Sequence, residues 1–159
     1  MLSDCNLAES DLMTSFKTSS AGYLANHVAR LFARELAEAV RPLGLAPAQF
    51  MVLLELWREE GLTQKDLVGR LDVEQATMAA TLARMERDGL IERRPDQADA
   101  RARRIQLTSR ARALQEPALA AAKGVNARAL AGFSDDEREA VLSGLRRIVG
   151  ALTRSAELG

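Results

Sequence analysis

The chain is poor in several residue types, and each shortage excludes a class of protein. Its 159 residues include one cysteine and one histidine, so neither an intrachain disulfide nor a Cys/His zinc cluster can form within one chain. Aromatic residues make up only 4%, whereas alanine and leucine are abundant, and this composition favours helices over sheets. No uninterrupted apolar run of about 18 residues is present and no basic stretch precedes an apolar run at the start. We therefore expect neither a membrane span nor a signal peptide, and we expect the protein in the cytoplasm.

The same shortages argue against an enzyme. His27 and Cys5 stand far apart in the sequence, and no glycine-rich phosphate loop accompanies them. We therefore expect no catalytic residues, no cofactor and no bound metal. Oxidant sensing by Cys5 would need a basic, partly enclosed site, which its sequence neighbours do not provide.

The net charge is zero, which by itself disfavours a nucleic-acid-binding domain. The charge is unevenly distributed, however. Residues 1–83 carry a net charge of −4, residues 84–112 carry +4 with nine arginines, and residues 113–159 are neutral. Arginine suits planar contacts with phosphate and guanine, so the central segment is a candidate for nucleic-acid contact.

Hydrophobic periodicity predicts helices through most of the first ninety residues. We expect one helix from about Ser20 to Arg41 and a second from Pro47 to Gly61. A short third helix would be capped by Thr63 with Asp66. A fourth would be capped by Asp72 with Gln75, would bury Met78, Leu82 and Met85, and would end at Gly89.

The pattern then changes to two short strands. We expect strands at residues 90–94 and 103–107, joined by a charged loop over residues 95–102. A fifth helix would start at Thr108 and reach about Ala131, with a kink or break at Pro117. A capping box of Ser134 and Glu137 would open a sixth helix.

This element order predicts a mainly α fold with a small β-hairpin wing, namely a winged helix-turn-helix flanked by further helices. In such a fold the second short helix lies in the major groove of DNA. Its outward face would carry Ala76, Thr77, Ala80, Arg84 and Arg87, with the two arginines near phosphates. The alternative is an ordinary solvated face whose arginines pair with Glu86 or Asp88.

The outer helices have apolar stripes too extensive for one small winged domain to cover. A homodimer would bury them and would read a pseudo-palindrome with half-sites roughly 34 Å apart. The expected dimerisation residues are Leu24, Leu31, Val141, Leu145, Ile148 and Leu152.

Several stretches resemble the MarR family of bacterial transcriptional regulators. They are Leu45–Phe50 with Leu53 and Leu54, Leu62–Leu67 ending at Leu71, Met85–Arg93, and Asp99–Arg101 followed by Arg104–Thr108. The resemblance covers about residues 20–155. It implies a double-stranded-DNA partner, and it assigns a dimerisation helix to residues 20–44, the winged helix-turn-helix to 45–108, dimerisation helices to 109–159 and an N-terminal arm to 1–19.

The resemblance also implies roles for the wing. Arg101 would enter the minor groove, and Asp99 would orient it through a salt bridge. Many relatives carry Thr-Arg where this chain has Ala79-Ala80, and Arg-Arg where it has Ala100-Arg101, so base reading would depend more on Gln75, Thr77 and DNA shape. The full expected DNA-contacting set is Gln75, Ala76, Thr77, Ala80, Thr81, Arg84, Arg87, Asp99, Arg101 and Arg103.

Members of this family usually repress, and many release DNA when a small aromatic or anionic effector binds. The corresponding residues here are Tyr23, His27, Arg30 and Trp57, the first three sharing one helix face. Core packing of Trp57 and interface packing of Tyr23 and His27 are the alternative. At the level of the whole protein, the competing hypothesis is a winged-helix interaction module that sequesters a protein partner.

Overall fold

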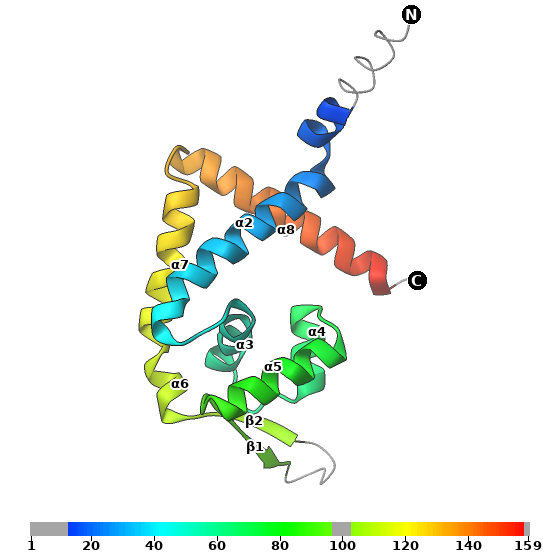
Figure 1. The fold of residues 1–159 in the computed structure, drawn as a ribbon. Coiled ribbons are helices and arrows are strands. Elements are labelled where there is room, and N and C mark those ends of the chain that lie inside the picture. The colour runs from blue at the N-terminus through cyan, green and yellow to red at the C-terminus, as the bar shows by residue number, and fades with distance from the viewer. Residues whose placement is uncertain (1–12, 97–102, 158–159) are drawn as a thin grey trace, which may run out of the picture. The chain divides into compact units, whose positions relative to one another are not determined.

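The computed structural model describes residues 13–96 and 103–157, without the side chains of residues 154–157 (Figure 1). The chain divides into two compact units, residues 1–122 and 123–159, and the division falls within one helix. Each unit is described separately.

The first unit begins with a short helical segment at residues 13–19 and continues with α2 (Ala21–Val40). The Ser20 side chain caps α2 by accepting a hydrogen bond from the backbone N–H of Tyr23 at 3.3 Å. A 3₁₀ turn, η1 (Arg41–Leu43), follows, and Gly44 closes it with a left-handed φ of 71°. The predicted first helix is confirmed to within a residue at each end.

Three helices then form the core of this unit: α3 (Pro47–Arg58), α4 (Gln64–Leu71) and α5 (Gln75–Arg87). The helix α3 is shorter than predicted because Gly61, with φ of 79°, turns its N–H toward the carbonyl of Ile105 at 3.0 Å. The predicted capping box of α4 is confirmed, since the backbone N–H of Thr63 donates to Asp66 Oδ2 at 2.8 Å and that of Asp66 donates to Thr63 Oγ1 at 3.2 Å.

The predicted cap of α5 is wrong. Asp72 is the C-cap of α4, where it adopts a left-handed φ of 50°, and Glu74 precedes α5 without a side-chain capping bond. The tight connection between the two helices needs one residue in the left-handed region, and aspartate tolerates it better than most non-glycine residues. The geometry of this turn therefore makes Asp72 the C-cap of α4 and not the N-cap of α5 that its residue type favours.

The wing is an antiparallel hairpin of β1 (Ile91–Pro95) and β2 (Arg103–Leu107), with Ile91 paired to Leu107 and Pro95 to Arg103. Strand β1 begins one residue later than predicted because the Leu90 N–H donates to the Met85 carbonyl at 2.9 Å, in the turn that ends α5. Pro95 belongs to the strand and not to the loop. Of the predicted loop, residues 97–102 lie outside the described residues.

One apolar core joins these elements. Its largest fully buried side chains come from the end of α2, from all three core helices, from the turn after α5 and from both strands: Val40, Val52, Leu53, Leu56, Leu67, Met78, Leu82, Met85, Leu90, Ile91 and Ile105. The hairpin is anchored to the helices by its inward-facing Ile91, Ile105 and Leu107, so α5 and the wing are held as one body.

The predicted fifth helix is broken, as Pro117 indicated. The first part is α6 (Ser109–Ala113), capped by Thr108, and the second is α7 (Gln115–Ala129), which crosses into the second unit. A proline at position 117 cannot donate a backbone hydrogen bond, and its ring crowds the carbonyl four residues earlier. The break at Leu114 removes this conflict.

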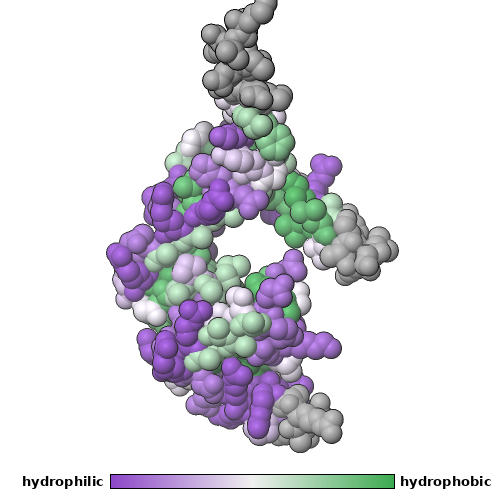
Figure 2. All heavy atoms as spheres, turned by 45° about the vertical axis from the view of Figure 1, so that its right-hand side comes forward, coloured by the Kyte–Doolittle hydropathy of each residue, from purple (hydrophilic) through white to green (hydrophobic). Residues whose placement is uncertain are grey.

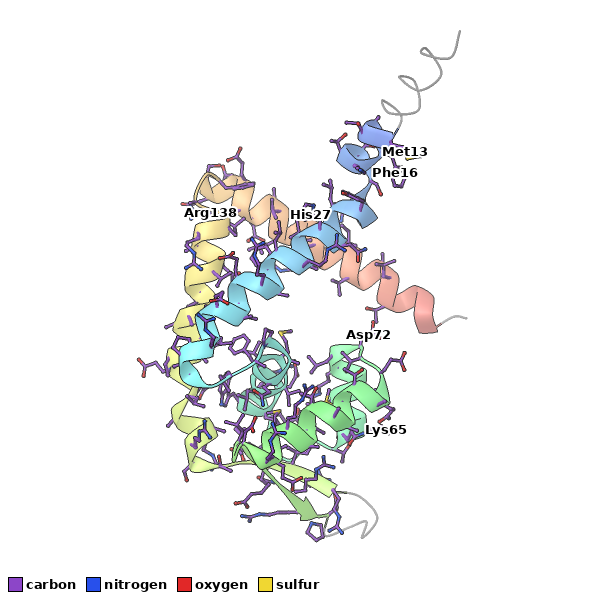
Figure 3. All side chains as sticks on the ribbon, in the orientation of Figure 1. Met13, Phe16, His27, Lys65, Asp72 and Arg138 are labelled. Atoms are coloured by element: carbon purple, nitrogen blue, oxygen red, sulfur yellow. The ribbon has the colours of Figure 1, made fainter. Side chains whose placement is uncertain are left out.

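The second unit continues with α8 (Asp135–Glu157). Its predicted capping box is confirmed, because the Ser134 N–H donates to Glu137 Oε2 at 2.8 Å and the Glu137 N–H donates to Ser134 Oγ at 3.3 Å. Arg138, labelled in Figure 3, also donates to the Leu130 carbonyl at 3.3 Å and so fixes the turn before the helix.

Within residues 13–96 and 103–157, no single helix is long and apolar enough to cross a membrane. Only Ala21–Leu43 and Pro47–Arg58 taken together satisfy the length and composition, and these two meet at a bend of 76°.

Candidate nucleic-acid interface

The helix α5 has one buried face and one exposed face. Met78, Leu82 and Met85 are buried in the core, as predicted. The opposite face exposes the residues expected to meet DNA: Gln75, Ala76, Thr77, Ala80, Arg84 and Arg87. Because the core fixes the rotation of α5 about its axis, this set cannot turn away from the surface without unfolding the domain.

Thr81 does not belong to this face. Its side chain is only 3% exposed, and its hydroxyl donates to the Thr77 carbonyl at 2.9 Å. The hydroxyl hydrogen is thus used within the helix, and burial of the side chain keeps its remaining lone pairs from a base edge. The geometry therefore does not support the sequence-based inclusion of Thr81 among the DNA contacts, because Thr81 lies one residue before Leu82, inside the buried stripe.

The two arginines of α5 differ in their partners. The Nε of Arg87 donates to Asp88 Oδ1 at 3.2 Å, while Asp88 Oδ2 accepts a 2.9 Å bond from Gln49 Nε2. The Gln49 bond is the main reason that the pKa of Asp88 lies below its usual range, with Arg87 adding to the effect. Arg84 is exposed and has no ion-pair partner among the described residues. The alternative interpretation, in which these arginines pair with a neighbouring carboxylate, thus holds for Arg87 and fails for Arg84.

An exposed ion pair such as Arg87–Asp88 contributes on the order of 0–1 kcal/mol. This is too little to prevent Arg87 from turning to a phosphate. Gln49, which sequence reasoning overlooked, supports the pair from within the core: its Oε1 also accepts the Ala46 N–H at 2.9 Å. A buried glutamine among leucines is the signal that could have identified it.

The wing strands carry four arginines with distinct environments. Arg93 contacts Glu86 at 3.3 Å and Arg94 contacts Glu92 at 3.0 Å. Arg104 pairs with the buried carboxylate of Asp96 and donates to the Gly61 carbonyl at 2.9 Å. Arg103 is exposed with no ion-pair partner in the described part of the chain, which leaves its charge available.

Arg104 is therefore a structural residue of the wing. It joins β2 to the segment before α4, where Thr63 and Arg104 also form an isolated β-bridge. The two remaining wing candidates, Asp99 and Arg101, lie outside the described residues. Figure 2 shows hydrophilic side chains over the hairpin end of the first unit.

One further side chain reaches the exposed face of α5. The Nε2 of Gln64, the first residue of α4, lies 3.1 Å from Gln75 Oε1 and 3.5 Å from the Gln75 carbonyl oxygen. Sequence reasoning missed Gln64, because the contact joins the starts of two different helices.

The candidate effector residues are only partly brought together. Tyr23 and His27 meet edge to face on α2, with ring centroids 6.3 Å apart, and Arg30 is exposed on the same helix. Trp57 has a separate role: its Nε1 donates to the Ala111 carbonyl at 3.0 Å, and its ring packs against Phe50 at 6.1 Å.

The predicted dimerisation residues expose large apolar side chains. Their exposed fractions lie between 37% and 67%, and the set comprises Leu24, Leu31, Val141, Leu145, Ile148 and Leu152. Figure 2 shows such apolar side chains gathered on α8. Soluble monomers rarely expose contiguous apolar stripes of this kind.

Comparison with known proteins agrees with this geometry. Residues 45–102, which contain α3 to the first part of the wing, match the model of the MarR family. The chain is 34% identical over 125 residues to the HTH-type transcriptional regulator TtmR of Methylorubrum extorquens, covering 79% of this chain and 62% of that protein. It is 32% identical over 110 residues to the HTH-type transcriptional repressor Rv2887 of Mycobacterium tuberculosis, covering 69% of this chain and 79% of the relative.

Solved structures show the same fold. A crystal structure of MarR superposes with a TM-score of 0.79 at 26% identity, covering 87% of this chain and 95% of the other. A MarR-family regulator of Listeria monocytogenes, solved with a 26mer DNA, superposes with a TM-score of 0.76 at 21% identity, covering 82% and 87%. The chain belongs to the MarR family of non-enzymatic, winged helix-turn-helix DNA-binding transcriptional regulators.

Proposed function

We propose that this regulator is a homodimeric repressor that binds a pseudo-palindromic operator and is released by a small aromatic or anionic effector. The exposed face of α5 carries the proposal: it presents two amide or hydroxyl groups, Gln75 and Thr77, followed by Arg84 and Arg87. Polar groups at the start of the helix suit base edges in the major groove, and arginines further along suit phosphates.

The wing extends this surface. Arg103 has an available charge, and Asp99 with Arg101 would complete a minor-groove contact at the tip. Contact with phosphates by several arginines makes binding steeply dependent on salt, since each contact releases about one counterion.

Dimerisation would bury the apolar stripes of α2 and α8, within residues 20–44 and 109–159 respectively. Exposed Leu24 and Leu31 on one helix and Leu145 and Ile148 on the other support this assignment. Two copies would then present two α5 helices to half-sites about one DNA turn, roughly 34 Å, apart.

The repressor assignment rests on relatives such as the mycobacterial protein named above. The effector assignment rests on the Tyr23–His27 pair with Arg30 on the same helix, a combination that suits an aromatic acid. Trp57 is a weaker effector contact because its N–H is already bonded.

Selection of bound fragments from a library of random duplexes tests the proposal. We expect an enriched palindrome, bound by two copies of the chain, with affinity that falls steeply as salt rises. Specific capture of a protein partner, without any enriched duplex at low salt, would replace the proposal with the sequestering module.

A further inference from the structure

The hydrogen bond between the side-chain amides of Gln64 and Gln75 determines which way the amide group of Gln75 points. We propose that Gln64 is a positioning residue that holds Gln75 as a hydrogen-bond donor toward DNA, so that Gln75 selects a guanine over an adenine. This inference rests on the proposed function, in which Gln75 contacts a base.

Neighbouring contacts hold the backbone of Gln64 in place. It follows Thr63, whose capping box with Asp66 fixes the first turn of α4, and Leu67 one turn later is fully buried. Thr63 is also bridged to β2 through Arg104. Lys65, the residue that follows Gln64, is labelled at this end of α4 in Figure 3.

The chemistry of Gln75 identifies which end of the Gln64 amide faces it. The main-chain carbonyl of Gln75 can only accept a hydrogen bond, and Gln64 Nε2 lies 3.5 Å from it. The same nitrogen lies 3.1 Å from Gln75 Oε1. An oxygen of Gln64 at this place would face two acceptors and be repelled, so the NH₂ group of Gln64 faces Gln75, and the oxygen of Gln75 is directed toward Gln64.

The polar group that remains for DNA is then the NH₂ of Gln75. In the described part of the chain this group has no hydrogen-bond partner, and the side chain is exposed at the first position of α5. An amide that reads adenine uses its oxygen and its nitrogen together, on adenine N6 and N7. Guanine instead presents two acceptors, N7 and O6, which an NH₂ group alone can satisfy.

Quantitative binding of single-base operator variants tests this assignment. All four base pairs are placed at each half-site position of the selected operator, and Kd is measured for the unmodified protein. Gln75→Ala identifies the position that Gln75 reads, where we expect guanine to be favoured by about tenfold and this preference to disappear in the variant.

Gln64→Met is the decisive variant, because methionine keeps the length and helix propensity of the side chain but cannot hydrogen-bond. We expect the guanine preference at the Gln75 position to fall several-fold, with preferences at all other positions unchanged. Lys65→Met is the matched control on the next residue of α4, and we expect it to leave every base preference as it was.

Gln64→Glu reverses the polarity of the contact. A carboxylate only accepts hydrogen bonds, so it would draw the NH₂ of Gln75 and direct the Gln75 oxygen outward. We expect the preference at that position to shift toward adenine or cytosine, whose amino groups donate.

The outcomes separate this inference from the proposed function. Failure of the unmodified protein to enrich any operator would overturn both. A specific operator with no position sensitive to Gln75→Ala would overturn only the inference. An unchanged guanine preference in Gln64→Met or Gln64→Glu would also overturn only the inference. So would a loss of affinity in Gln64→Met that is equal at all operator positions, because such a loss would mean that Gln64 contacts phosphate or stabilises the fold.

Discussion

Trp57 donates its indole N–H to the backbone carbonyl of Ala111 at 3.0 Å and thereby joins α3 to α6. The two residues are 54 positions apart, and Ala111 itself is fully buried. Replacing Trp57 by phenylalanine would leave the Ala111 carbonyl without this donor.

We expect Trp57→Phe to lower the free energy of unfolding by about 1–3 kcal/mol, since it leaves a part-buried acceptor unsatisfied and reduces packing against Phe50. Urea denaturation at a fixed protein concentration measures this, because dimerisation would make stability concentration-dependent. Tyr23→Phe, on an exposed ring, is the control and should change stability by less than about 0.5 kcal/mol. Equal stability of Trp57→Phe and the unmodified protein would show that the hydrogen bond contributes nothing net.

The available charge of Arg84 predicts a loss of DNA affinity without loss of stability. We expect Arg84→Ala to weaken operator binding and to reduce the salt dependence by about one counterion. Fluorescence anisotropy over a salt series measures both quantities. Arg34→Ala, which removes an exposed α2 arginine paired with Glu35 at 3.5 Å, is the control. A salt slope that matches that of the unmodified protein would remove Arg84 from the interface.

The exposed apolar stripe of α8 predicts a dimer that one charge can disrupt. We expect Leu145→Asp to shift sedimentation from dimer to monomer, because a carboxylate in an apolar interface is costly to desolvate. On the same helix, Arg146→Ala removes only an exposed pair with Glu139 at 2.8 Å and should leave the dimer intact. A monomer in the unmodified protein would contradict the prediction before any variant is tested.

The capping box of α4 predicts a specific acid sensitivity. Hydrogen bonds from the backbone N–H and then from the hydroxyl of Thr63 lower the pKa of Asp66 below its ordinary value of 3.8. A carboxyl with a depressed pKa in the folded state stabilises the fold above the ordinary pKa, and this contribution is lost as pH falls through the lower, folded-state pKa.

We therefore expect Asp66→Asn to destabilise the protein at pH 7 and to approach the stability of the unmodified protein as the medium becomes strongly acidic. Denaturation curves collected from pH 7 to about pH 2 measure the difference. Asp135→Asn, whose carboxylate is exposed at the start of α8, is a control for general charge effects. A stability difference that stays constant with pH would show that the Asp66 charge is not responsible.

Much of the fold was predictable because local chemistry and the final structure agree. Thr63, Thr108 and Ser134 each cap the helix that was expected of them. The buried face of α5 follows from the spacing of Met78, Leu82 and Met85 alone. Asp72 is the exception, since its cap position depended on the turn between α4 and α5 and not on residue preference.

The sequence by itself determined the helix order, the hairpin and the concentration of arginines in residues 84–112, and these point to the face that we propose meets DNA. These features depend on periodicity and capping, which act over a few residues. Only the tertiary structure decided which of the polar side chains are available. It buries Thr81, pairs Arg104 with Asp96, bonds Trp57 to Ala111 and places Gln64 beside Gln75. Each of these depends on where a separate element lies in space, and no local pattern carries that information.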